Sequence, residues 1–374
     1  IMGFVALATS RIRIALLVVT LLIGCGLLGM WSDTMDTIAM TIAAVVLSLA
    51  IGIPLGIWAG LSDRVLKILT PFLDLAQILP TLVYLAPLAI FFMIGEAAAT
   101  IATMIYSVPI AIRITSHAIR SLNISPVEAS ISMGATERQT LRKVQLPMAK
   151  QMIVLGINQT VMAALSFVVI AALIAAPGLG KPVVSALTIQ NTGQGLVAGL
   201  AVVFLAILLD RATSAAATNQ QSFIPPTERQ LRARRRNLII TGALTVIAVL
   251  ASHFVESLGN FPTKIDIATP IANATNRFVN FLVNDISFST VAFKDLISIW
   301  VLNPIEDMLA RAPWFMTLTM FVIVALVLAG ARIALLTFAL LMAIVVTGLW
   351  FDAMVTLTQT IVATMLTMIV GVLL

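Results

Sequence analysis

Residues 36–60 read DTIAMTIAAVVLSLAIGIPLGIWAG, and Asp36 is the one charged side chain among them. An apolar run of this length fits an α-helix that crosses a bilayer, which needs about 20 residues. Further apolar runs lie at approximately 1–9, 13–30, 72–95, 97–118, 151–176, 195–213, 238–255, 314–330, 333–349 and 353–374. Transmembrane β-strands would instead alternate over about 10 residues. The pattern therefore predicts an all-α, polytopic bundle of transmembrane helices.

The composition agrees with a membrane environment. Of the 374 residues, 60% are hydrophobic and 10% are charged, whereas a soluble domain carries about 25% charged residues. The mean hydropathy is +1.08, so the lipid bilayer is the first expected partner. The net charge of +6 does not indicate nucleic-acid binding, because the basic residues lie in short stretches between apolar runs, as the positive-inside rule describes.

The basic residues also orient the chain in the membrane. We place the basic stretches on the cytoplasmic side, at residues 11–13, 63–67, 138–150, 229–236 and 332. The long polar loop after residue 118 is then cytoplasmic, and residues 256–312 lie outside. That outer segment is too polar to span, but Phe278, Phe281 and Leu282 recur at helical spacing. We expect an amphipathic helix on the outer membrane surface, with a docking surface for an extracellular partner as the alternative.

The sequence offers no signal of catalysis. Cys25 is the single cysteine, and the two histidines, His117 and His253, are far apart, so we expect neither a disulfide nor a metal site. The chain contains no Gly-x-x-x-x-Gly-Lys-Ser/Thr phosphate loop. We therefore expect no catalytic residue and no cofactor.

The chain contains an internal repeat. The 43 residues from Arg13 align without gaps to those from Arg332, and about 18 positions are identical. Apolar bias alone would not align the pairs Trp31/Trp350, Asp33/Asp352 and Gly52/Gly371. We expect one transport unit, a connecting region, and the opening of a second unit.

One polar loop stands out between the apolar runs, and residues 125–151 of it read SPVEASISMGATERQTLRKVQLPMAKQ. Ser125-Pro126 is a helix-start signal, so Glu128 and Ala129 should open a short helix that Gly134 caps. A second helix should run from Glu137 to Val144, carrying Arg138, and Leu146-Pro147 should stop it. Two short helices joined at a glycine predict a compact knob facing the cytoplasm.

The spacing in this loop resembles the EAA signature of bacterial ABC-importer permeases. The family pattern is Glu-Ala-Ala, three residues, Gly, nine residues, an aliphatic residue, one residue, and Leu-Pro. This chain has Glu128-Ala129-Ser130, Gly134, Val144 and Leu146-Pro147, with Ser130 in place of Ala and Val144 in place of Ile. Residues 52–95, 156–180 and 201–213 also resemble the glycine betaine/proline betaine permease subfamily, and the resemblance covers residues 31–214.

The resemblance implies a fold, partners and a cargo. The fold would be the type I ABC importer permease bundle, in the bacterial inner membrane. The loop would be the coupling helix that contacts a cytoplasmic ABC ATPase subunit through Glu128, Ala129, Gly134, Arg138, Leu146 and Pro147. An extracytoplasmic substrate-binding protein would deliver glycine betaine, proline betaine or a related quaternary ammonium osmoprotectant.

Polar residues inside the spans are candidates for the substrate pathway. Burying a polar side chain in lipid costs free energy, so such residues often have a function. They are Gln77, Asn158, Gln159, Thr160 and Ser166. Each has an alternative interpretation as a hydrogen bond between helices. A quaternary ammonium cargo would favour an aromatic cage. The few aromatic residues of the spans do not predict one, so the cargo rests on the resemblance.

The domain organisation that we expect has five parts. They are leader helices at 1–30, which look truncated; a complete permease unit at 31–214 with its coupling loop at 125–147; a basic cytoplasmic linker at 215–237; connecting helices at 238–349; and a truncated second unit at 350–374. Three other functions stay open. The permease could carry an amino acid, taurine or a nitrate-like solute, or the chain could be an ion-coupled secondary transporter or a membrane scaffold.

Overall fold

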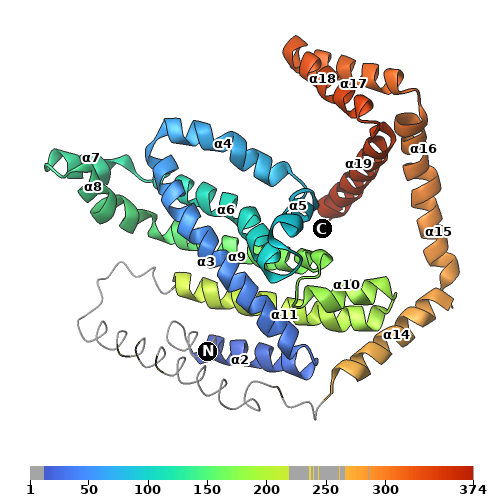
Figure 1. Cartoon of the computed structure of the whole chain (residues 1–374), viewed down its shortest axis with the longest axis horizontal. Coiled ribbons are helices and arrows are strands. Elements are labelled where there is room, and N and C mark those ends of the chain that lie inside the picture. The colour runs from blue at the N-terminus through green and yellow to red at the C-terminus, as the bar shows by residue number, and fades with distance from the viewer. Residues whose placement is uncertain are drawn as a thin grey trace. The chain divides into compact units, whose positions relative to one another are not determined.

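The computed structural model describes residues 12–218, 266–284 and 286–373, together with residues 236, 239, 243 and 261. Every regular element in these ranges is a helix, so the all-α prediction is confirmed (Figure 1). The chain divides into two compact units, Ile1–Arg277 and Phe278–Leu374, and each is described by itself.

Unit 1 contains the helices α2 (Ile12–Leu27), α3 (Trp31–Leu61), α4 (Asp63–Ile78), α5 (Thr81–Phe92), α6 (Glu96–Arg120), α7 (Ile124–Ser132), α8 (Glu137–Thr140), α9 (Leu146–Ile170), α10 (Gly180–Thr188) and α11 (Thr192–Thr218). A π-helical turn, Leu141–Gln145, joins α8 to α9, and a 3₁₀ turn, Ala171–Ile174, follows α9. Helix α14 (Ala268–Asn284) begins in unit 1 and ends in unit 2.

Unit 2 contains α15 (Ser287–Ile297), α16 (Asn303–Glu306), α17 (Trp314–Ala329), α18 (Ala331–Val346) and α19 (Trp350–Leu373). Two π-helical turns, Ser298–Leu302 and Asp307–Arg311, flank α16. The described part of the segment 256–312 is thus largely helical. Its placement on the outer membrane surface stays a prediction.

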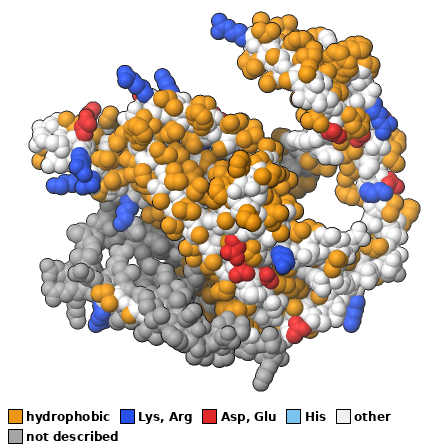
Figure 2. Space-filling view, in the orientation of Figure 1, with side chains coloured by type: hydrophobic (Ala, Val, Ile, Leu, Met, Phe, Trp, Pro, Cys, Tyr) orange, Lys and Arg blue, Asp and Glu red, His pale blue; other side chains and the backbone are white. Residues whose placement is uncertain are grey.

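Several described helices are long and apolar enough to cross a membrane. They are Trp31–Leu61, Glu96–Arg120, Glu137–Ile174, Thr192–Ser214 and Trp350–Val372. Apolar side chains cover much of the visible surface of the described residues (Figure 2), which is favourable where the solvent is lipid. The predicted span 1–9 lies outside the described residues, and most of 238–255 and of the linker 215–237 does as well.

The predicted apolar run at 72–95 is not one straight helix. Helices α4 and α5 meet at a bend of 94°, between Ile78 and Thr81. Pro80 has no backbone N–H and forces Leu79 into an extended conformation, with ψ at 124°, so the helix cannot continue through this point. An ion pair of 2.6 Å between Asp63 and Arg120 joins the start of α4 to the end of α6.

The core of unit 1 forms where α3 packs along α6 and α6 along α9. Gly52, Gly56 and Gly60 of α3 lie four residues apart and face α6. A Cβ atom added to these glycines would lie 2.5 Å from the Cβ of Ala111, 2.6 Å from that of Thr115 and 2.7 Å from that of Ile119. Glycine at this spacing lets two transmembrane backbones approach closely, which fixes α3 against α6.

The internal repeat has the same local structure in both copies. Helix α2 ends shortly before α3 begins at Trp31, and α18 ends shortly before α19 begins at Trp350. The breaks contain Gly29 and Gly348, which align in the repeat and have φ angles of +70° and +76°. This left-handed conformation favours glycine, so both glycines are retained for the same turn.

Candidate functional site

The polar loop after α6 folds into two short helices, as predicted. Helix α7 begins at Ile124, and the Asn123 side chain caps it by accepting a hydrogen bond from the Ser125 N–H over 3.1 Å. The start therefore lies earlier than predicted, so Glu128 and Ala129 lie in the second turn rather than at the opening. Both residues are exposed.

Gly134 ends α7 as predicted. Its φ angle is +81°, its N–H donates to the Ile131 carbonyl over 2.8 Å, and the Ala135 N–H donates to the Ser130 carbonyl over 3.1 Å. This pair of bonds is the Schellman motif, in which a left-handed glycine satisfies the last carbonyls of a helix. The glycine thus sets the sharp turn between α7 and α8.

The second helix begins at Glu137 as predicted, but it does not end at Leu146-Pro147. Thr136 and Gln139 form a capping box at its start. The chain then continues through the π-helical turn into α9, so that Glu137–Ile174 is one long helical segment. Pro147 would clash with the carbonyl of Lys143 in a regular α-helix. The wider turn at residues 141–145 relieves that clash and lets the helix continue.

The base of the loop is anchored and its tip is exposed. Leu146 packs against Ala118, Ile119 and Ala149 in a small apolar cluster, and the Ser130 and Thr140 hydroxyls lie 3.0 Å apart and join α7 to α8. Arg138 and Pro147 are exposed, like Glu128. Ile124, Ile131 and Met133 are 65%, 57% and 87% exposed. Figure 1 shows α7 and α8 at one end of the helices of unit 1, so the loop presents a mixed apolar and charged surface.

The predicted pathway residues of α9 divide between two faces. Asn158 and Thr160 are buried, at 7% and 0% exposed, whereas Gln159 and Ser166 are exposed. The Thr160 and Ser166 hydroxyls donate to carbonyls of the preceding turn, over 2.8 and 3.0 Å. Gln77 is exposed on α4. The structure therefore does not bring the five residues into one site.

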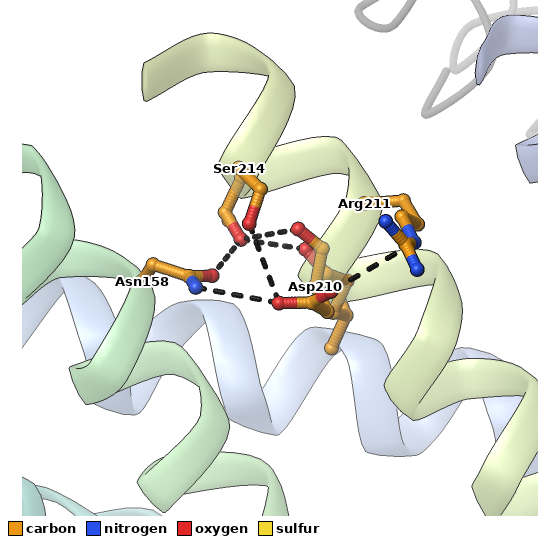
Figure 3. A network of polar contacts seen from close by, with 6 residues as sticks. Asn158, Asp210, Arg211 and Ser214 are labelled. Carbon is orange, nitrogen blue, oxygen red and sulfur yellow. Dashed lines mark hydrogen bonds and ion pairs between the residues drawn. The ribbon is translucent and has the colours of Figure 1, made fainter. Parts of the chain in front are cut away.

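Asn158 belongs to a polar network between α9 and α11. Its Nδ2 donates to Asp210 Oδ1 over 3.3 Å, and its Oδ1 accepts from the Thr213 hydroxyl. Ser214 Oγ also donates to Asp210 Oδ1 over 3.3 Å. Figure 3 shows Asn158 and Ser214 converging on Asp210, with Arg211 on its other side. The alternative interpretation of Asn158, a hydrogen bond between helices, fits this geometry.

Three of the aromatic residues gather in the membrane-spanning part of unit 1. Phe167 lies between Tyr84 and Tyr106, with ring centroids 6.1 and 5.3 Å away. Phe167 is fully buried, so the three rings pack against one another and leave no open space for a cation between them. This stack is a packed core element rather than a cage.

The sequence did not point to Asp210 as the partner of Asn158, nor to Gly52, Gly56 and Gly60 as the contact with α6. A signal for each is nonetheless present. Asp210 is an acidic residue near the end of an apolar run, and three glycines spaced four apart are typical of close helix packing.

Comparisons with known proteins match the region that holds the loop and the network. A family model for the inner membrane component of binding-protein-dependent transport systems matches residues 52–220. GbuB, a glycine betaine/carnitine transport permease protein of Listeria monocytogenes, is 45% identical over 188 residues, which cover 50% of this chain and 67% of that protein. The chain belongs to the family of inner membrane components of binding-protein-dependent transport systems. It is therefore an inner-membrane protein, as predicted.

Two other relatives differ in how much of the chain they match. OpuAB, a glycine betaine transport system permease protein of Bacillus subtilis, is 46% identical over 50% of this chain and 66% of its own length. TmoV, a trimethylamine N-oxide transport system permease protein of Ruegeria pomeroyi, is 30% identical over 96% of this chain and 55% of its own length. The chain thus spans about two thirds of the betaine permeases that it matches. These relatives are transport proteins by name, not enzymes.

Proposed function

We propose that the chain is the permease subunit of an ATP-driven type I ABC importer for glycine betaine, proline betaine or a related quaternary ammonium osmoprotectant. The observation that carries the proposal is the loop from Asn123 to Pro147. It combines the EAA spacing with an exposed tip and an anchored base, as a surface for a soluble partner requires. The ATPase subunit would contact this loop, and a substrate-binding protein would contact the opposite side of the membrane.

The continuous helix from Glu137 to Ile174 supports a mechanical role for the loop. A displacement of α8 by the ATPase subunit would move α9 directly, because no break separates the two. Glu128 and Arg138 would supply oriented charges, while Ile131 and Met133 would supply apolar contact area. Gly134 would keep the turn sharp enough for close approach, and Leu146 would hold the base of the loop against α6.

The substrate pathway would lie along the exposed face of α9. Gln159 and Ser166 are seven residues apart, two turns on the same side of the helix, and among the described residues neither forms a hydrogen bond to a neighbouring helix. Gln77 is a further exposed candidate on α4. Asn158 and Thr160 would instead hold α9 in place. Within this arrangement residues 31–214 act as one permease unit, and residues 350–374 repeat its opening.

The second candidate cargo is trimethylamine N-oxide. The match to TmoV extends over 96% of this chain, including the connecting region and the start of the repeat, whereas the match to OpuAB covers 50%. Trimethylamine N-oxide is also a small dipolar solute with a methylated nitrogen, so the two cargoes share their chemistry.

The proposal is tested by uptake into proteoliposomes that contain the full permease and its ATPase subunit, with the substrate-binding protein outside. We expect uptake of radiolabelled glycine betaine to need ATP inside the vesicles and the binding protein outside. Parallel uptake of trimethylamine N-oxide decides between the cargoes. Uptake that continues without ATP and follows an ion gradient would contradict the proposal and favour a secondary transporter.

A further inference from the structure

A polar cleft lies at the end of unit 1 opposite the coupling loop. Its volume is about 590 Å³, within the range of small-molecule sites. The start of α3, helix α10, the start of α11 and the first turns of α14 form its walls. The charges of the loops place this end on the outer side of the membrane, where a delivered solute would arrive.

Two side chains of opposite charge line the cleft. Asp33 projects from the first turn of α3 and Lys181 from the first turn of α10. Both are described residues, and no ion pair within 4.0 Å joins them. Ser185, Gln194 and Asn273 add hydroxyl and amide groups to the wall. The cleft therefore offers a carboxylate and an ammonium group to one occupant.

Hydrogen bonds hold the walls of the cleft in place. Asn276 of α14 accepts from the Gly193 N–H over 2.7 Å and from the Thr192 hydroxyl over 3.0 Å, so it caps the start of α11. A Cβ on Gly193 would come within 2.2 Å of the Ala272 carbonyl oxygen, which shows how closely α14 approaches. On the other side, the Thr37 hydroxyl donates to the Asp33 carbonyl and accepts from the Leu179 N–H, over 2.7 and 2.8 Å.

The internal repeat keeps the acidic residue that faces the cleft. Asp33 and Thr37 recur as Asp352 and Thr356, and the Thr356 hydroxyl donates to the Asp352 carbonyl over 2.7 Å, as Thr37 does to Asp33. Asp36 is one turn further along α3, is exposed, and aligns with Val355. Of the two acidic residues at the start of α3, Asp33 is therefore the one that both copies of the repeat contain.

We propose that this cleft is a receiving site for a dipolar methylated-ammonium solute, with the cationic group toward Asp33 and the anionic group toward Lys181. The inference rests on the proposed import function and adds a site to it. A solute that carries both charges matches the pair, whereas a single ion leaves one of the two groups without a counter-charge. No aromatic ring of the described residues lines the cleft, so binding is weak, as suits a site that must release its solute inward.

The test uses Ser185→Cys in the full permease, because Ser185 lines the cleft and the native Cys25 is fully buried. Labelling of the new thiol by a membrane-impermeant maleimide is followed with glycine betaine at about 10 mM. For a Kd on the order of 1 mM the labelling rate should fall by about tenfold. Tetramethylammonium and acetate, which each carry one of the two charges, should slow labelling far less.

Three variants in this background identify the groups involved. Asp33→Asn and Lys181→Met should each abolish the protection by glycine betaine, whereas Asp36→Asn should retain it. An unchanged labelling rate without solute shows that a variant keeps the cleft intact. The charge-exchanged pair Asp33→Lys with Lys181→Asp should regain protection, because a dipolar solute can bind in the reverse direction.

The outcomes separate the two proposals. If proteoliposomes take up glycine betaine with ATP but the solute gives no protection, the cleft is not its receiving site and the import function stands. If protection occurs and no solute is taken up, the import function is wrong and the cleft remains a dipolar site. Protection that survives both Asp33→Asn and Lys181→Met would overturn the assignment of the charges.

Discussion

The proposed coupling loop leads through α8 directly into helix α9, yet the polar residues of the loop and of α9 lie in opposite environments. In the loop, Glu128 and Arg138 are exposed, and the side-chain hydrogen bonds join residues no more than ten positions apart. In α9, Asn158 is buried and bonded to residues more than 50 positions away, while Gln159 beside it is exposed. A polar residue in an apolar helix is therefore not by itself a pathway residue, because neighbouring helices decide its role.

The largest expected effect comes from the contact that positions both regions. Gly56→Leu places a side chain where Thr115 and the Ile112 carbonyl already lie, with a Cβ at 2.6 and 2.9 Å. We expect a loss of roughly 3 kcal/mol of stability, at the upper end of overpacking effects, and a strongly reduced yield of folded protein. Thermal unfolding in detergent measures the loss of stability. Gly199→Leu is the control, because a Cβ there meets nothing within 4 Å. An equal loss of stability in both variants would contradict the close packing of α3 against α6.

The next effect separates the two faces of α9. Asn158→Ala leaves Asp210 and Thr213 without a partner across the helices, and we expect destabilisation of about 1 kcal/mol. Gln159→Ala should leave stability unchanged and lower the transport rate instead. Thermal unfolding and uptake are measured on both variants. The comparison fails if Asn158→Ala retains full stability while transport falls.

A smaller effect should remain within the loop. Gly134→Ala adds a Cβ in open space but at a φ of +81°, and the left-handed conformation costs a non-glycine residue about 1 kcal/mol. We expect faster hydrogen exchange in residues 124–140 and an unchanged unfolding midpoint of the bundle. If exchange accelerates throughout the bundle, the loop and the bundle do not open independently.

The smallest effect concerns the departure from the family pattern. Ser130→Ala restores the EAA residue and removes the hydrogen bond of 3.0 Å between the Ser130 and Thr140 hydroxyls. Because the site is partly exposed, we expect a loss of only about 0.5 kcal/mol and coupled transport close to that of the native chain. Hydrogen exchange at the start of α8 measures the loosening. A loss of transport would mean that Ser130 has a role that alanine cannot fill.

The sequence predicted the features that depend on neighbouring residues. The Gly134 cap and the start at Glu137 follow from local hydrogen bonding and lie where expected. One error concerns a proline: Pro147 was expected to stop the second helix of the loop, yet it lies within a continuous helix. At Pro80, in contrast, α4 and α5 meet at a bend of 94°. A proline changes the local geometry, and tertiary packing determines whether a bend or a π-helical turn absorbs that change.

The remaining features depend on which helices meet. Asn158 finds Asp210, and Asp33 shares a cleft with Lys181 and α14, only after distant segments pack together. The polarity of a single residue does not show whether it will be buried in a contact between helices or exposed, since Asn158 and Gln159 are adjacent residues of the same chemical type. The repeat supplied the additional information, because it retains Asp33 and not Asp36.

The most direct test of the central claim is co-purification of the ATPase subunit with the permease. Glu128→Lys reverses one exposed charge at the tip of the loop, and Glu96→Lys makes the same change on an exposed residue at the first turn of α6, near the other end of the bundle. We expect Glu128→Lys to lower the bound ATPase subunit by about tenfold, corresponding to about 1.4 kcal/mol, and Glu96→Lys to leave it unchanged. Native levels of ATPase subunit on the Glu128→Lys permease would contradict the coupling role of the loop.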